Sequence, residues 1–223
     1  MHSAKDDSLE ETSMKVSEAV AARISARAFL PDPVPDEVIR RVLERASRAP
    51  SGGNLQPWIV SVLNGPKLDE FRAIAAQRLE ETDGQGEGFE YKVYPDNLHE
   101  PYRSRRFGVG EMMYAKLGIE RADKPGRLAW FANNYRFFGA PAAFFIHVDR
   151  RMNAPQWSDL GMFLQTVMLL FQEEGYDTCA QEAWARLHET IDAFTGASEE
   201  TMVVAVKMRT VTTRIDGLLL SVK

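Results

Sequence analysis

The stretch Arg48-Ala-Pro-Ser-Gly-Gly-Asn-Leu-Gln-Pro-Trp58 joins a predicted amphipathic helix to a predicted apolar strand. The helix must end by Ala49, because a residue before proline is pushed out of the helical region. Glycine lets backbone N–H groups approach a ligand closely. The amides of Asn54 and Gln56 offer both donors and acceptors, as the edge of a pyrimidine-like ring requires. The stretch therefore predicts either a ligand-binding loop or a plain helix-to-strand turn.

A second segment, Arg23-Ile-Ser-Ala-Arg-Ala-Phe29, lies one helix upstream. Its arginines, Arg23 and Arg27, stand on one helical face or flank one bend. Guanidinium groups suit phosphate and carbonyl oxygens, which favours an anion clamp. Cations are also favourable at the C-terminus of a helix, here the one predicted from Ser13 to Ala22. The segment alone leaves both interpretations open.

The composition is that of a globular protein. The 223 residues suffice for one domain with a sizeable core. A net charge of -5 disfavours a bulk nucleic-acid binder. The single cysteine, Cys179, excludes an internal disulfide and suits a reducing compartment. We interpret it as a packing residue rather than a nucleophile.

Several classes of site and location are not expected. The four histidines and the cysteine lack metal-ligand spacing, so we expect no metal site. Residues 1–12 are polar and predict a disordered tail without a secretory signal. No segment approaches the roughly 20 apolar residues that span a bilayer. We therefore expect a cytoplasmic protein with neither membrane nor nucleic acid as a partner.

Hydrophobic periodicity predicts the regular elements. Continuous apolar runs indicate buried strands at Trp58–Leu63, Ala142–Val148 and Thr201–Met208, with a short extended piece at Asp177–Ala180. Further helices are expected at 36–49, 66–81, about 109–117, about 124–137, 155–174 and 182–194. His147 lies within a predicted strand, so we interpret it as a hydrogen-bonded core histidine rather than a catalyst.

The helix predicted at Pro155–Glu174 is apolar around most of its circumference, as buried helices are. Gly175 follows it as the expected C-cap.

Taken together, these motifs resemble one known family. Arg23-x-Ser-x-Arg-x-Phe29 followed by Ala49-Pro-Ser-Gly-Gly-Asn-Leu-Gln-Pro-Trp58 is similar to the start of the nitroreductase superfamily of FMN flavoproteins. The resemblance continues at 159–170 and 175–184 and covers about residues 14 to 208. It implies an α+β fold with three α/β/α layers around a central mixed, mostly antiparallel sheet. It also implies one domain over 13–223 and an intertwined homodimer with the 155–174 helix at its interface.

The resemblance further implies FMN as cofactor and NADH or NADPH as co-substrate. Hydride would pass to a small electron-poor aromatic acceptor, such as a nitroaromatic or a quinone. Because the flavin carries the chemistry, we expect no indispensable catalytic side chain. The implied cofactor-binding residues are Arg23, Ile24, Ser25, Arg27, Pro50, Ser51, Gly52, Asn54, Gln56, Asn133, Arg136, Gln181, Glu182, Ala183 and Arg214.

Individual roles follow from the same resemblance. Arg23 and Ser25 would hold phosphate and ribityl oxygens, and Arg27 would lie near flavin N1 and O2, where positive charge favours reduction. The segment 50–54 would reach the flavin of the partner subunit. Within the superfamily, a reductive dehalogenase or a flavin-consuming enzyme is the alternative. A non-catalytic FMN-binding protein is the alternative from another class.

Two regions depart from the family pattern. After Met208 the chain lacks the usual Gly-Pro turn, and Arg209 or Arg214 are candidate replacements for the phosphate ligands. Residues 83–137 are expected to form a lid-like insertion that selects the substrate. Its cluster Arg103-Ser-Arg-Arg106 is either a solvated surface or an attractor for an anionic substrate such as an aromatic carboxylate.

Overall fold

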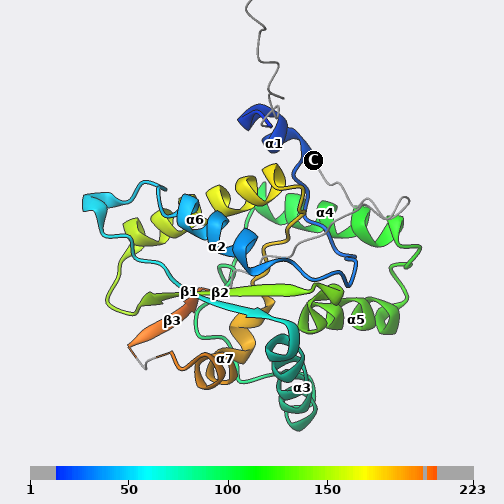
Figure 1. Cartoon of the computed structure of the whole chain (residues 1–223). Coiled ribbons are helices and arrows are strands. Elements are labelled where there is room, and N and C mark those ends of the chain that lie inside the picture. The colour runs from blue at the N-terminus through cyan, green and yellow to red at the C-terminus, as the bar shows by residue number, and fades with distance from the viewer. Residues whose placement is uncertain (1–13, 198–199, 205–223) are drawn as a thin grey trace, which may run out of the picture.

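The computed structural model describes residues 14–197 and 200–204. At its centre lies an antiparallel sheet of three strands, β1 (Ile59–Asn64), β2 (Ala142–Asp149) and β3 (Thr201–Val204), with β2 in the middle. Helices lie on both sides of this sheet (Figure 1). The predicted tail and the part of the last predicted strand beyond Val204 fall outside the described residues.

Strand β2 forms the axis of the core. Every residue from Ala142 to Val148 is buried, as its continuous apolar run predicted. Because successive side chains point to opposite faces, Phe144 and Ile146 belong to one hydrophobic cluster, and Ala143 and Phe145 belong to another.

The first cluster lies under α2 (Asp36–Ala46) and α6 (Ala154–Glu173). Buried side chains of α2 recur three and four residues apart, at Ile39, Val42 and Ala46. The two helices are also joined by Arg41, whose guanidinium binds both carboxylate oxygens of Glu174 at 2.9 and 2.6 Å. Gly175 follows α6 with a left-handed φ of 82°, which confirms the predicted C-cap.

The second cluster lies under α3 (Gly65–Glu81) and α7 (His188–Thr195). It is rich in aromatic rings: Phe71 packs within 6 Å of Phe145 and Trp184, measured between ring centroids. His147 faces this side and is fully buried, which confirms its core position. Its Nε2 lies 3.3 Å from Oδ1 of Asp192, yet neither ring nitrogen forms a hydrogen bond within the described residues. The core position of the predicted histidine is thus confirmed, whereas its hydrogen bond stays a prediction.

Three predicted helices have different boundaries. Helix α4 (Tyr102–Lys116) begins before Val109, because the Glu100 carboxylate accepts the Ser104 N–H at 3.3 Å and binds Arg103. Helix α5 (Lys124–Ala132) stops early and continues as the 3₁₀ segment η2 (Asn133–Gly139). There Phe137 and Phe138 adopt left-handed φ angles of 58° and 46°.

The cause in η2 is tertiary packing. Both phenylalanines are buried, and the Phe137 ring lies 4.5 Å from Trp184 between centroids. The last predicted helix is likewise divided, into the 3₁₀ segment η3 (Ala183–Leu187) and α7. The remaining elements are α1 (Val16–Ala22) and η1 (Gly52–Asn54). Among the described helices, none combines the length and hydropathy needed to cross a bilayer.

Candidate active site

Two adjoining cavities open between the N-terminal segment, α4, α5 and the chain after α6. Their volumes are about 740 Å³ and about 640 Å³. They have five wall residues in common, which are Arg27, Tyr94, Arg106, Phe131 and Asn134. Shared walls make the two cavities parts of one site.

The first cavity contains the predicted N-terminal clamp. Arg23, Ile24, Ser25 and Arg27 all line it. The chain leaves α1 at Arg23 with extended backbone, at φ -61° and ψ 126°. These arginines therefore flank an extended segment, so the prediction that they stand on one helical face is wrong, and no bend lies between them.

A parallel β-bridge fixes this segment against the chain after α6. Ser25 pairs with Thr178, and the Ala26 N–H donates to the Thr178 carbonyl at 3.2 Å. The predicted extended piece at 177–180 thus lies beside the clamp. It brings two segments more than 150 residues apart to the same place.

The bridge places 181–183 at the second cavity. Gln181, Glu182 and Ala183 line it together with Arg27. Gln181 is 6% exposed, and its amide nitrogen donates to Oδ1 of Asn134. Its Oε1 is buried and has no hydrogen-bond partner within the described residues. Desolvation raises the pKa of the Glu182 carboxyl.

The clamp arginines have no ionic partner in the part of the chain that the structure describes. Arg27 donates from Nη1 to the Ser25 carbonyl at 3.2 Å. Neither Arg23 nor Arg27 has a carboxylate within ion-pair distance in the ranges 14–197 and 200–204. Guanidinium forks beside a hydroxyl and an unpartnered amide oxygen fit a ligand with a phosphate and a ring that both donates and accepts hydrogen bonds. An FMN molecule has these groups, so the residues present fit it.

The loop that contains Pro50, Ser51, Gly52, Asn54 and Gln56 lies elsewhere. Its backbone N–H at Gly52 donates to both carboxylate oxygens of Asp159, at 3.3 and 3.2 Å. The Gln56 amide donates to Oδ1 of Asn54 at 2.9 Å. All these residues except Ser51 are exposed, and they are not part of the wall of either cavity. Within one chain, the loop and the clamp do not meet.

The other predicted ligands have mixed placements. Asn133 and Arg136 do not line the two cavities, whereas their neighbour Asn134 lines both. Asn134 was missed because successive residues of a 3₁₀ turn point in different directions, and sequence spacing does not fix which one faces a ligand. Arg209 and Arg214 lie outside the described residues. Arg186, which lines the second cavity, was also missed, since it was assigned to an ordinary helix.

The region 83–137 supplies much of the cavity wall. Phe89, Val93 and Tyr94 come from its first loop, Asn134 comes from η2, and the others come from α4 and α5. From α4 and α5 these are Arg106, Val109, Gly110, Met113, Tyr114, Trp130 and Phe131. Apolar and aromatic side chains dominate, as in sites that bind flat organic molecules.

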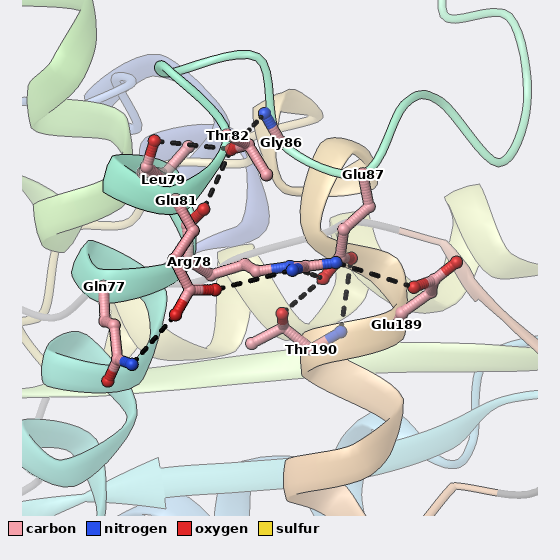
Figure 2. A network of polar contacts seen from close by, with 9 residues as sticks. All are labelled: Gln77, Arg78, Leu79, Glu81, Thr82, Gly86, Glu87, Glu189 and Thr190. Carbon is pink, nitrogen blue, oxygen red and sulfur yellow. Dashed lines mark hydrogen bonds and ion pairs between the residues drawn. The ribbon is translucent and has the colours of Figure 1, made fainter.

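A buried carboxylate anchors the first loop of this region. Glu87 has a side chain only 2% exposed and accepts from Nε of Arg78 at 3.0 Å. It also accepts from the backbone N–H of Thr190 at 3.2 Å and from the Thr190 hydroxyl (Figure 2). Its own N–H donates to the Arg186 carbonyl at 2.7 Å. The loop is thereby tied to α3, α7 and η3 at one point.

The comparisons with known proteins agree with this arrangement. Residues 20–208 match the sequence profile of the nitroreductase family. The chain is 34% identical over 175 residues to a 4-nitrobenzoate reductase of Pseudomonas putida, covering 78% of this chain and 75% of the relative. It is 33% identical over 196 residues to a chloronitrobenzene nitroreductase of Comamonas testosteroni, covering 87% and 85%.

A solved structure is similar over nearly the whole chain. It is the FMN- and NADPH-dependent nitroreductase NfnB from Sphigopyxis sp. strain HMH, with a TM-score of 0.88 and 42% identity. The match covers 94% of this chain and 93% of that one. Fold and site thus define an α+β domain in which two arginines without a described ionic partner line a large cavity. The chain belongs to the nitroreductase family.

Proposed function

We propose that this protein is an FMN-dependent oxidoreductase that uses NADPH or NADH to reduce electron-poor aromatic acceptors, nitroaromatics and quinones. One observation carries the proposal: the Ser25–Thr178 bridge brings the arginine clamp and residues 181–183 to one continuous cavity. The relatives named above reduce nitroaromatic compounds according to their names. The NfnB structure is described as dependent on FMN and NADPH.

In this proposal the chain's own residues position the reactants. Arg23 and Ser25 bind the phosphate and ribityl oxygens of FMN, and Arg27 holds the carbonyl edge of the ring. Gln181 meets a ring donor with its unpartnered Oε1. When bound, FMN supplies two-electron transfer between the nicotinamide and the acceptor. The net first reduction consumes a nitroarene, NADPH and a proton, and yields a nitrosoarene, NADP⁺ and water.

We propose further that the active unit is a cytoplasmic homodimer of three-layer subunits. The loop 50–56 lies outside its own chain's cavities, so its amides would serve the flavin of the partner subunit. Apolar side chains near α6 support such an interface: Val16 is 73% exposed, and Val20, Leu55 and Met162 are also exposed. A single buried cysteine agrees with a reducing compartment. Residues 83–137 act as the substrate lid.

The test is spectroscopic. Purified protein loaded with FMN should be yellow, and NADPH should bleach it without air until a nitroarene is added. A yellow protein that neither NADPH nor NADH bleaches would support a binding protein instead. A protein that does not take up FMN would remove the proposal altogether.

A variant tests the clamp. Arg27→Ala should weaken FMN binding by about 10- to 100-fold, the effect of one lost charge-assisted hydrogen bond. Arg40→Ala is the matched control, because Arg40 is exposed on α2 and lines neither cavity. Equal FMN affinity of the two variants would withdraw the role given to Arg27. Equilibrium titration followed by flavin fluorescence measures both.

A further inference from the structure

The second cavity has a marked excess of positive charge. Three guanidinium groups line it, from Arg27, Arg106 and Arg186. The carboxylate in the same wall belongs to Glu182, whose pKa is raised by desolvation, so its negative charge is disfavoured there. Arg27 is already assigned to the cofactor. Arg106 and Arg186 have no role in that assignment.

Each of these two arginines rests on an aromatic ring of the first lid loop. Cζ of Arg106 lies 4.1 Å from the ring centroid of Tyr94. Cζ of Arg186 lies 4.6 Å from the ring centroid of Phe89. Stacking occupies the face of a guanidinium and leaves its in-plane N–H donors for an oxyanion. Arg186 additionally contacts the Tyr135 hydroxyl, and the charge of Arg186 opposes the rise in the pKa of Tyr135 that burial causes.

Neither arginine has an ionic partner in the described part of the chain. A similar arginine nearby, Arg127, has such a partner. Arg127 also lies over a tyrosine ring, that of Tyr114, but it binds both carboxylate oxygens of Glu111 at 2.6 and 3.1 Å. The charge of Arg127 is thus neutralised within the fold, whereas Arg106 and Arg186 present their charge to a cavity.

We propose that Arg106 and Arg186 form an oxyanion site for the carboxylate of an aromatic acceptor, of which 4-nitrobenzoate is the simplest type. This inference rests on the proposed function, since it names the acceptor class of the same site. The rings of Phe89, Tyr94 and Phe131 line the cavity and provide apolar surface for the acceptor's own ring. A volume of about 640 Å³ suffices for such a molecule beside a cofactor.

A phosphate of the pyridine nucleotide is a second oxyanion that fits the same two arginines. The experiment therefore uses ligands that differ only in charge. Benzoate and benzamide have nearly the same size and neither is reduced, so their binding to oxidised holoenzyme is measured at equilibrium. The reducible pair, 4-nitrobenzoate and 4-nitrobenzamide, is compared by kcat/KM at saturating NADPH and again at saturating NADH.

The main variant is Arg106→Gln, and Arg105→Gln is its matched control. Arg105 is the neighbouring arginine of α4 and is exposed, but it does not line either cavity. Both variants change the net charge equally, so only a local contact distinguishes them. Arg106→Lys keeps the charge without the fork and should retain part of the effect. Arg186→Gln repeats the test at the second arginine.

We expect Arg106→Gln to weaken benzoate binding and raise the KM for 4-nitrobenzoate by about tenfold. Benzamide, 4-nitrobenzamide and bound FMN should change by less than about twofold, as should every quantity in Arg105→Gln. Equal losses for charged and neutral ligands would assign Arg106 to loop packing and overturn the proposal. A change confined to the KM for NADPH, or a loss of FMN, would also overturn it by assigning the site to a phosphate.

The two hypotheses fail in different ways. If the wild-type holoenzyme reduces neither nitro compound, the proposed function fails. Arg106-dependent binding of benzoate would then still support the oxyanion site. If both compounds are reduced with equal kcat/KM and benzoate does not bind, the oxyanion site fails while the reductase stands.

Discussion

Charged side chains lie at both ends of the segment 86–106, but their surroundings differ. At its start, Glu87 is buried and meets three donors from Arg78 and Thr190. Glu90 is likewise buried, binding Arg150 and accepting from the backbone N–H of Val203 at 3.1 Å. At its end, Arg106 is exposed, stacked on a ring and without an ion pair in the described residues.

The difference separates structural charge from charge available to a ligand. A buried charge is tolerated only when it is paired and hydrogen-bonded, so the start of the segment must stay as it is. An unpaired guanidinium at a cavity costs little, because water solvates it until an anion replaces the water. The paired end holds the loop in place, and the unpaired end then lies at a fixed position in the cavity wall.

The largest effect is expected at the paired end. Glu87→Ala removes the buried acceptor that Arg78 and Thr190 share and should lower the free energy of unfolding by about 2–4 kcal/mol. Glu81→Ala is the control, since Glu81 also accepts from Arg78, at 3.5 Å, but is 48% exposed. It should change stability little. Urea unfolding of the holoprotein measures both, and similar midpoints for the two variants would contradict the structural role of Glu87.

A smaller effect should follow from moving the loop without changing a charge. Gly86 has φ of 70°, and a Cβ there would lie 2.5 Å from the Arg186 carbonyl oxygen. Gly84 has φ of 76°, but a Cβ there meets no atom within 4 Å. Gly84→Ala should therefore lower the free energy of unfolding only by the backbone strain, about 1 kcal/mol. Gly86→Ala adds a steric clash and should lower it by about 2–3 kcal/mol.

The two alanine variants, Gly84→Ala and Gly86→Ala, also test whether the two ends of the segment 86–106 are coupled. Because Gly86 packs on the backbone of Arg186, Gly86→Ala should raise the KM for 4-nitrobenzoate more than that for 4-nitrobenzamide. Gly84→Ala should leave the ratio unchanged. Steady-state kinetics of the two alanine variants decides, and an unchanged ratio in both would show that the cavity end does not depend on the paired end.

A third prediction concerns pH. Desolvation, followed by the charge of Glu90, raises the pKa of Asp192 from 3.8 to about 6. The folded state thus holds this proton more tightly than the unfolded state. Its contribution to stability is complete below pH 3.8 and is lost as the pH rises through about 6. Groups that face Asp192 are Glu87, Glu90, His147, Arg150 and His188.

Asp192→Asn removes this titration. Asp192 is in partial contact with solvent, which reduces the expected effect. The free energy of unfolding of wild type should therefore fall by about 1 kcal/mol relative to that of the variant as the pH rises from about 4 to about 7.5. His147 has the opposite slope, because burial lowers its pKa to about 4 and stability falls as the pH drops from 6.5. His147 is present in both proteins and lies 3.3 Å from Asp192, so the difference between them reports Asp192 together with its coupling to His147. Urea unfolding across this range checks it, and a pH-independent difference would contradict the assignment.

Much of the fold was predictable because its signals are local. The apolar run at 142–148 and the spacing of Ile39, Val42 and Ala46 each specify an element by periodicity alone. What failed depends on distant partners. Phe137 leaves the helix because the aromatic core around Trp184 receives its ring, and the buried ring of Phe138 packs against Trp130. Such packing energy overrides helix propensity and leaves no mark in the neighbouring sequence.

The site residues likewise divide into those that a local motif predicts and those that only the fold brings together. Arg23, Ser25 and Arg27 were identified because their motif is contiguous, and they do line the cavity. Arg186 was missed because only the fold brings it to the second cavity, where its ring partner, Phe89, comes from a distant loop. The sequence indicated a basic cluster at 103–106. It did not distinguish Arg106, which lines the cavity, from Arg105, which does not.

The smallest expected effect uses salt to separate the two ends. Exposed charges are screened within about 8 Å at physiological ionic strength, whereas buried pairs are screened much less. Raising salt from about 0.02 to about 0.3 M should therefore increase the KM for 4-nitrobenzoate about threefold and leave that for 4-nitrobenzamide unchanged. The stability difference between wild type and Glu87→Ala should stay constant over the same range. If salt reduced that difference as well, Glu87 would be solvated rather than buried, and the contrast between the two ends would lose its physical basis.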